Sequence, residues 1–166
     1  SGDSYGGIVT MSGGGTLAGT SATELSDDMK GFAGLVYCGN DKYAVLFQAD
    51  TGDYAHYCVA TVSGGNTTWG TDTTYESSAT TVEAWCLGYD SSVDKVIAVQ
   101  KIQSVSSTSY TTGDLSGTTI TFAALADFPV GAVLADMMIM YDPVLEQTVW
   151  ISKRASAMYL QLWTVT

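Results

Sequence analysis

The sequence predicts an all-β protein made of about three antiparallel repeats of the propeller-blade type, each with four strands and roughly 51–53 residues. The first observation is a Ser-Gly turn that separates an apolar run from a short Thr-rich run and recurs along the chain. The second is the regular spacing of three tyrosines and of the turn glycines. The tyrosines Tyr37, Tyr89 and Tyr141 stand 52 residues apart each time, and Gly13, Gly64 and Gly117 stand 51 and 53 residues apart.

The recurring turn is clearest in residues 58–71, CVATVSGGNTTWGT. Residues 8–20, IVTMSGGGTLAGT, and residues 112–122, TGDLSGTTITF, follow the same pattern. Glycine adopts a positive φ at little cost, so an apolar run, a Ser-Gly turn and a Thr-rich run predict a β-hairpin.

Residues 1–20 are predicted to form a partial repeat, with strands at 8–11 and 16–20 joined by a turn at 12–15. The segment SATELSDDMKGF, residues 21–32, is the most polar stretch of the chain. We expect it to be a connecting loop, because the run is too short to hold more than one helical turn.

Repeat 1, residues 34–71, is predicted to contain a strand ending at Tyr37, a turn at 39–42 and a second strand at 43–47. The second strand is apolar at every position, which indicates burial on both of its faces. A loop at 50–54 leads to the third strand, and the fourth ends near Trp69.

Repeat 2, residues 85–122, has the same order, with a third strand near 110–115 and a fourth at 119–122. Repeat 3, residues 137–166, is truncated after its third strand, which is predicted at 159–165. We treat residues 1–166 as a single β-repeat domain, a length that can bury a substantial core. About three repeats are present, whereas propellers close with 4–8 blades.

Charge and composition restrict the partners. The net charge is −11, which repels nucleic-acid phosphates and anionic membranes, so we expect no nucleic-acid partner. No window of 18 apolar residues exists, so we expect no membrane insertion. Only 14% of the residues are charged, and solubility must depend on Ser, Thr, Asn and Gly. Such a surface is ordinary in secreted or virion β-proteins, and the scattered acidic residues are expected to form a solvated surface.

The three cysteines, Cys38, Cys58 and Cys86, lie in apolar runs and show no metal-ligand spacing. We expect them to be small buried hydrophobic residues, with one Cys38–Cys58 disulfide as the alternative. The cysteines therefore do not indicate whether the protein is located in a reducing or an oxidising compartment.

The second and third units contain several motifs that carry a resemblance to known repeats. They are GYD and DKVIAV, SGTTITF, and MYDPVLEQTVWI. With them, the chain from Gly34 onward resembles the β-propeller-like repeats of bacteriophage tail-fibre and other virion-surface proteins. The first unit departs from the pattern, with Cys38 where the aspartate would fall. The second lacks the proline and ends in Phe122-Ala123 where the first has Trp69-Gly70.

The resemblance implies a non-enzymatic structural protein at a virion surface or in another extracellular location. Its implied partners are copies of itself, other virion proteins or a host glycan. The residues themselves favour assembly, because incomplete terminal repeats leave open sheet edges that another chain can cover.

Two patterns bear on catalysis. Asp50-Thr51-Gly52 follows an apolar run, as in the catalytic loop of aspartic proteases, but such a site needs two carboxylates. The motif occurs once, so we expect ordinary turn chemistry. His56 is the only histidine, and no G-x-S-x-G or other nucleophile motif accompanies it. We expect it to be a packed or surface strand residue.

Asp90, Asp94 and Asp142 fall in the turns between the first and second strands of their repeats. Carboxylates in such turns can bind calcium, but the D-x-D-x-D-G spacing is missing. We expect Asx-turn capping instead. No catalytic, cofactor-binding or metal-binding residue is therefore predicted.

The triplet Gln161-Leu162-Trp163 matches the Q-x-W motif of trefoil lectins but occurs once. A β-trefoil or three-sheet β-prism is the alternative fold, and a carbohydrate-binding adhesin or lectin module is the alternative function. Four tryptophans are candidates for stacking on sugar rings, although most are expected in the core: Trp69, Trp85, Trp150 and Trp163. Asn66-Thr67-Thr68 is a glycosylation sequon at a predicted hairpin tip.

Overall fold

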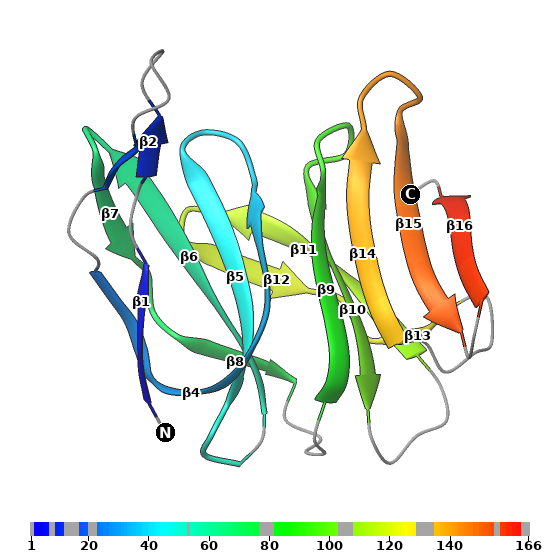
Figure 1. Cartoon of the computed structure of the whole chain (residues 1–166), viewed down its shortest axis with the longest axis horizontal. Helices are drawn as coiled ribbons and strands as arrows, with labels where there is room; N and C mark the ends of the chain where they lie inside the picture. Colours follow the sequence, from blue (N-terminus) through cyan, green and yellow to red (C-terminus); the bar gives the residue numbers. More distant parts are fainter. Residues whose placement is uncertain are drawn as a thin grey trace.

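The computed structural model shows an all-β protein built from antiparallel strands (Figure 1), as the sequence predicts. It describes residues 2–6, 9–11, 17–19, 23–52, 54–76, 82–102, 108–128, 135–154 and 157–163. Within these ranges no sheet closes into a barrel, and no helix is long and apolar enough to cross a membrane. The assignment of the sheets to propeller blades stays a prediction.

Three sheets lie side by side in chain order across Figure 1. The first sheet has the order β1-β4-β5-β6-β7, with β8 also paired to β6. Its strands are β1 (Gly2–Gly6), β4 (Thr23–Tyr37), β5 (Lys42–Ala49), β6 (Ala55–Ser63), β7 (Asn66–Trp69) and β8 (Thr73–Glu76). A separate hairpin joins β2 (Val9–Met11) and β3 (Leu17–Gly19), which confirms the predicted N-terminal strand pair.

The second sheet has the order β12-β11-β10-β9, with β13 paired to β11. Its strands are β9 (Val82–Asp90), β10 (Lys95–Ile102), β11 (Thr108–Ser116), β12 (Thr119–Phe122) and β13 (Ala126–Asp127). The third sheet contains β14 (Ala135–Asp142), β15 (Gln147–Arg154) and β16 (Ala157–Trp163) in that order. The third sheet therefore has no fourth strand among the described residues.

The two Ser-Gly hairpins within the described ranges are confirmed. Ser63 pairs with Asn66 across Gly64 and Gly65, which have φ values of 57° and 82°. Ser116 pairs with Thr119, and Gly117 has a φ of 62°. The N-terminal turn at 12–15 lies outside the described residues. Glycine at these corners supplies the left-handed conformation that a tight hairpin requires.

The predicted loop at 21–32 is wrong, because β4 begins at Thr23 and continues without interruption to Tyr37. Its first half pairs with β1, where Glu24 lies opposite Tyr5, and its second half pairs with β5. Strand formation depends on available pairing partners more than on local polarity, so two neighbouring strands overrode the polar composition.

The strand registers define which positions of the repeats are equivalent. Lys42 and Lys95 occupy the same place, because each starts the second strand and pairs with the third. Cys38, Asp90 and Asp142 then coincide at the end of the first strand: Cys38 N donates to Lys42 O over 2.8 Å, and Asp90 and Asp142 pair with Lys95 and Gln147. The turn between the first and second strands of repeat 1 is one residue shorter than the same turn in the other repeats. Equivalent residues of repeats 1 and 2 are therefore 52 positions apart before this turn and 53 positions apart after it.

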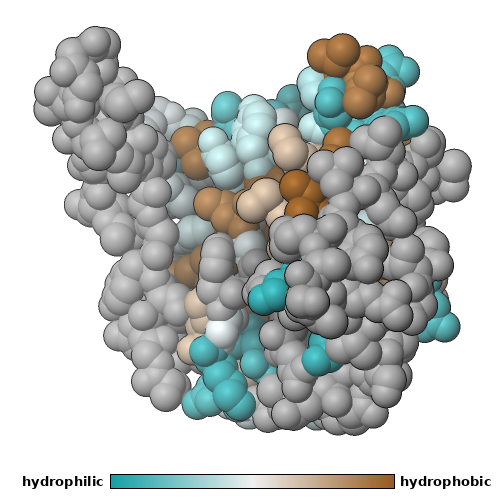
Figure 2. Space-filling model, turned by 45° about the vertical axis from the view of Figure 1, so that its right-hand side comes forward, coloured by the Kyte–Doolittle hydropathy of each residue, from teal (hydrophilic) through white to brown (hydrophobic). Residues whose placement is uncertain are grey.

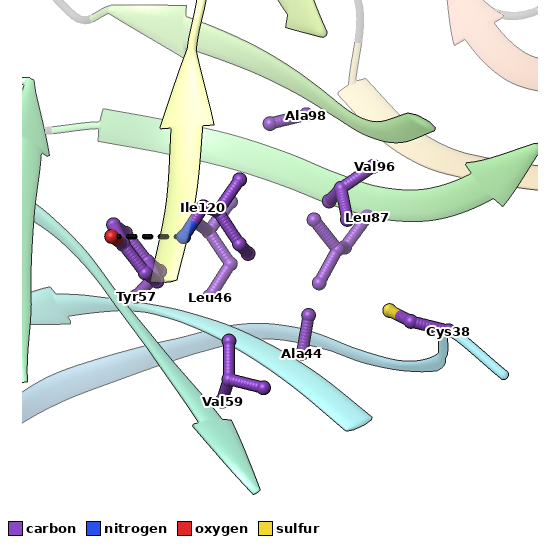
Figure 3. Packing of buried hydrophobic residues seen from close by; sticks show 9 residues of the cluster. All are labelled: Cys38, Ala44, Leu46, Tyr57, Val59, Leu87, Val96, Ala98 and Ile120. Atoms are coloured by element: carbon purple, nitrogen blue, oxygen red, sulfur yellow. Dashed lines mark hydrogen bonds between the residues drawn. The ribbon is translucent and has the colours of Figure 1, made fainter. Parts of the chain in front are cut away.

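The core lies between the sheets. Between the first and second sheets, Leu46, Tyr57 and Val59 pack near Leu87 and Val96 (Figure 3). Between the second and third, Ile97 and Val99 pack near Trp150. The first strands β4, β9 and β14 make the closest approach from sheet to sheet. Residues 44–49 of β5 are all buried, which confirms the predicted burial on both faces.

Polar contacts cross these apolar layers. The backbone N–H of Ile120 donates to Tyr57 Oη over 3.1 Å, as the dashed line in Figure 3 shows. The Tyr75 hydroxyl donates to Gln100 Oε1 over 2.5 Å. Such buried bonds fix the alignment of one sheet on the next, because a displaced donor would lose its partner.

Candidate functional site

The Asp50-Thr51-Gly52 motif forms an exposed turn between β5 and β6. Ala49 N donates to Tyr54 O over 3.0 Å and closes the turn. Gly52 has a φ of 80°, and a Cβ there would lie 2.7 Å from the Tyr54 ring, so both conformation and space require glycine. The turn-chemistry interpretation is confirmed for this motif.

His56 lies on β6 and takes part in a chain of side-chain contacts that the sequence did not predict. Its Nδ1 is 2.6 Å from Asp72 Oδ1, and its Nε2 is 2.9 Å from Thr74 Oγ1. The His56 side chain is 15% exposed. The Phe47 ring lies 5.7 Å away, centroid to centroid.

An acid, an imidazole and a hydroxyl in this order are also the parts of a nucleophilic triad. Here the strand pairing accounts for the arrangement, since β8 pairs with β6 and places Thr74 directly opposite His56. Asp72 precedes Thr74 by two residues, the spacing that puts side chains on one face. We therefore interpret the contacts as an anchor that holds β8 on β6.

Asp90 is almost fully buried and connects the second sheet to the third. Its Oδ1 accepts from Ser92 N over 3.0 Å and from Ser92 Oγ over 2.6 Å, which forms an Asx turn. Its Oδ2 accepts from Thr148 Oγ1 of β15 over 3.0 Å. The predicted capping role is confirmed, and the contact to the neighbouring sheet is an addition to it.

Asp142 confirms the same capping role, because its Oδ1 accepts from Val144 N over 2.8 Å and from Leu145 N over 3.1 Å. Asp94 differs, since its Oδ1 accepts a 2.5 Å bond from the Tyr89 hydroxyl. Burial first, and then this bond, raise the pKa of Tyr89. In the described ranges, no three potential ligands gather in a group that could hold a metal ion.

All three cysteines are buried and free, so the predicted burial is confirmed and the Cys38–Cys58 disulfide is wrong. The two residues belong to different clusters: Cys38 packs between the first and second sheets, and Cys58 packs with Val45 and Phe47. Burial raises the pKa of Cys38 and Cys58 to about 11 and that of Cys86 to about 12. These thiols therefore stay protonated and unreactive at neutral pH.

The described tryptophan side chains do not present open rings. Trp150 is 2% exposed, and its ring lies 4.5 Å from that of Phe128, which confirms the expected core position. Trp69 is half-buried against Val45, Phe47 and Cys58. Trp85 lies on β9 and the Gln161-Leu162-Trp163 triplet on β16, but these side chains fall outside the described part. Asn66 is exposed at its hairpin tip, as predicted.

The most distinctive surface is the outer face of the third sheet. Met138 and Met140 of β14 are 61% and 55% exposed. They lie opposite Ile151 and Val149 of β15, which are half-buried. This face was not predicted from the sequence. Successive side chains of a strand point to opposite faces, so the apolar run Met138, Ile139 and Met140 indicates a strand that is apolar on both faces.

Exposed apolar side chains also occur at the β14–β15 turn, where Val144 and Leu145 are 87% and 55% exposed. Figure 2 shows a brown, hydrophobic group at its upper right. Comparisons with family models, curated proteins and solved structures gave no match. Function is therefore inferred from the geometry described above.

Proposed function

We propose that the chain is a non-enzymatic structural protein that assembles with copies of itself or with neighbouring subunits at a virion surface or in another extracellular structure. The observation that carries this proposal is the exposed apolar face of the third sheet. The first two sheets bury the equivalent face against the next sheet of the chain.

Apolar area removed from water contributes about 25 cal/mol per Å², so a subunit gains free energy by covering such a face. Large exposed apolar patches commonly mark protein interaction sites. A sheet face is also rigid, so it can bind a partner without first being ordered.

The contacts of the candidate catalytic and metal-binding residues also support a structural role. Asp90 and Asp142 cap turns, and His56 pairs across two strands. The virion and extracellular parts of the proposal rest on the resemblance of the repeat motifs and on the low fraction of charged residues. Trp69 and Trp150 are not exposed, so neither supports the alternative of glycan binding.

The first test is the native mass in solution, measured by light scattering alongside intact mass spectrometry of the 17.4 kDa chain. We expect a mass above that of the monomer, increasing with protein concentration. A monomer at every accessible concentration, also when mixed with fractions of its native source, would contradict the proposal.

Location needs a separate test. Gold-labelled antibodies raised against the purified chain are expected to decorate sedimented particles or extracellular fibres from the native source. Labelling confined to the soluble fraction of lysed cells would reject the virion and extracellular parts while leaving self-assembly intact.

A further inference from the structure

The two internal interfaces use equivalent positions. We call the face of a sheet that is directed toward the preceding sheet its N-side face, and the opposite face its C-side face. The C-side face holds Ala44 and Leu46 in the first sheet and Ile97 and Val99 in the second. The N-side face holds Leu87, Val96 and Ala98 in the second sheet and Ile139, Thr148 and Trp150 in the third.

The C-side face of the third sheet has apolar residues at the same positions, but no element of the described chain covers it. Met138 is equivalent to Cys86, and it is 61% exposed where Cys86 is 5% exposed. Met140 is equivalent to Gly88, which is buried under the third sheet. Val149 and Ile151 are equivalent to the buried Ile97 and Val99.

The N-side face of the first sheet is open at one end. Leu35 is equivalent to Leu87 and Ile139, but it is 56% exposed where they are 8% and 7% exposed. Tyr37, two residues later, is also exposed. The other end of this face is covered within the chain, because Val45, Phe47 and Cys58 pack with Leu25, Met29 and Trp69.

The two open regions lie at matching heights of their sheets. A Cβ on Gly34 would lie 3.2 Å from Leu87 Cβ, and one on Gly88 would lie 2.7 Å from Ile139 Cγ2. These contacts show that the Leu87 and Ile139 positions meet the first strand of the preceding sheet. By the same register, Leu35 of one copy would meet Met138 and Met140 of another. Each internal interface has one glycine at these positions, Gly34 or Gly88, whereas the proposed contact has methionine at both, so the two copies must lie farther apart than the internal sheets do.

We propose that the C-side face of the third sheet docks on the open end of the N-side face of the first sheet of a second copy, head to tail. This inference rests on the proposed function and names the surface through which self-assembly occurs. The contact continues the stacking that already joins the three sheets within one chain. Because the two surfaces differ, the interface is heterologous.

One polar pair supports the register. In the second internal interface, Asp90 Oδ2 accepts from Thr148 Oγ1, and the equivalent pair in the proposed contact is Asp142 with Tyr43 of the other copy. Asp142 uses Oδ1 to cap its own turn, and within the described residues Oδ2 receives no donor. The Tyr43 hydroxyl can supply that donor, and its ring already lies beside Tyr37 of the open end, 5.1 Å away.

The first internal interface replaces this pair by Cys38 and Val96, which share one apolar cluster. Polarity is thus matched at this position in both internal interfaces. An aspartate facing a tyrosine preserves the match, whereas an aspartate facing an apolar side chain would lose solvation without a compensating bond.

The test compares sedimentation velocity of the native chain with that of Met140→Lys and Leu35→Lys, one change on each proposed surface. Val144→Lys is the matched control, because Val144 is 87% exposed at the β14–β15 turn and lies on neither surface. We expect the native chain and the control to associate and each of the other two variants to be monomeric. Circular dichroism and the emission of the four tryptophans, of which Trp150 is buried, verify that all variants fold.

Mixing the two monomeric variants gives the decisive result. Met140→Lys retains an intact N-side face and Leu35→Lys an intact C-side face, so the mixture is expected to form a dimer and nothing larger. Association of Leu35→Lys alone, with no gain on mixing, would show a symmetric contact and overturn the proposal.

Failure of this inference and of the proposed function can be distinguished. If all variants associate like the native chain, self-assembly stands and the docking surfaces are wrong. If the native chain is monomeric at every concentration, this inference is wrong, and the proposed function is also wrong when the chain stays monomeric in fractions of its native source. Tyr43→Phe is expected to weaken the native association by about tenfold, the loss of one hydrogen bond to a charged group. Its effect should vanish in the Asp142→Ala background, and an unchanged effect there would reject the register.

Discussion

Two buried hydroxyls of β15 differ in what they contact. Thr148 donates to Asp90 Oδ2 across the sheet interface, and Ser152, four residues later, has no hydrogen-bond partner in the described chain for its Oγ. Both side chains are at most 1% exposed and lie in the layer between the second and third sheets. The pair therefore separates the effect of a hydrogen bond from that of burial.

We expect Thr148→Val to lower the free energy of unfolding by about 1–3 kcal/mol, because it leaves a buried carboxylate oxygen without its donor. Ser152→Ala is expected to change it by less than about 0.5 kcal/mol or to stabilise the fold, since an unsatisfied hydroxyl is removed. Urea unfolding followed by tryptophan emission measures both. Equal losses in the two variants would contradict the role of Asp90.

The Cys86 thiol makes stability depend on alkaline pH. Burial raises its pKa from 9.0 to about 12, so the folded protein keeps a proton that the unfolded chain releases. The contribution is fully present below about pH 9 and is lost as the pH rises toward 12. Between these values the free energy of unfolding should fall by up to about 1.4 kcal/mol per pH unit from this thiol.

Cys86→Ala is the matched variant for this pH effect. It is expected to lower stability at neutral pH by leaving a small cavity, yet to show a shallower decline between pH 9 and 12. Thermal unfolding at a series of pH values gives both slopes. Parallel curves for the two proteins would show that Cys86 does not titrate in this way.

At the scale of the elements, the distance between sheets depends on small residues of the first strands. Gly88 of β9 lies against Ile139 of β14, and an added Cβ would come within 2.7 Å of that side chain. Gly31 of β4 is a contrast, since its nearest atom, Gln48 Oε1, would be 3.9 Å away.

Gly88→Ala is expected to destabilise the protein by about 1–3 kcal/mol, because the second and third sheets must separate. Gly31→Ala should be neutral or stabilising by up to about 1 kcal/mol, as alanine limits the unfolded chain more than glycine. Thermal unfolding compares them. A neutral Gly88→Ala would mean that the two sheets are less tightly packed.

Some elements could be predicted from the sequence because their signal is local. The hairpins at Gly64 and Gly117 need only a glycine between two strand-like runs, and the capping by Asp90 and Asp142 needs only an amide a few residues on. The first part of β4 was missed, because its formation depends on pairing with β1 and β5 and not on its own polar composition.

The same distinction applies to the candidate site. His56 was identified, but its partners Asp72 and Thr74 lie 16 and 18 residues away and meet it only through the register of β8 on β6. The open face of the third sheet was missed for a related reason. Met138 and Met140 look like core residues in the sequence, and only the stacking order shows that nothing in the described chain covers them.

At the scale of the whole molecule, the net charge of −11 opposes association between copies. The proposed contact is mainly apolar, so it gains little from charge attraction. Raising the salt concentration from about 0.01 M to about 0.15 M shortens the screening length from about 30 Å to about 8 Å. We expect the dissociation constant of self-association to fall several-fold over this range, as measured by sedimentation equilibrium. A rise with salt would indicate that ion pairs hold the copies together.

β10 has a special place in the molecule, because β9 and β11 pair with its two edges and the first and third sheets cover its two faces. Its backbone amides are thus enclosed on four sides, whereas β16 lies at an edge of its sheet among the described strands. Deuterium should enter β16 through local fraying and β10 only when the whole stack opens. The exchange rate of residues 96–100 would then report the global unfolding free energy, and a gradient toward the last strand would show how far cooperativity extends along the repeats.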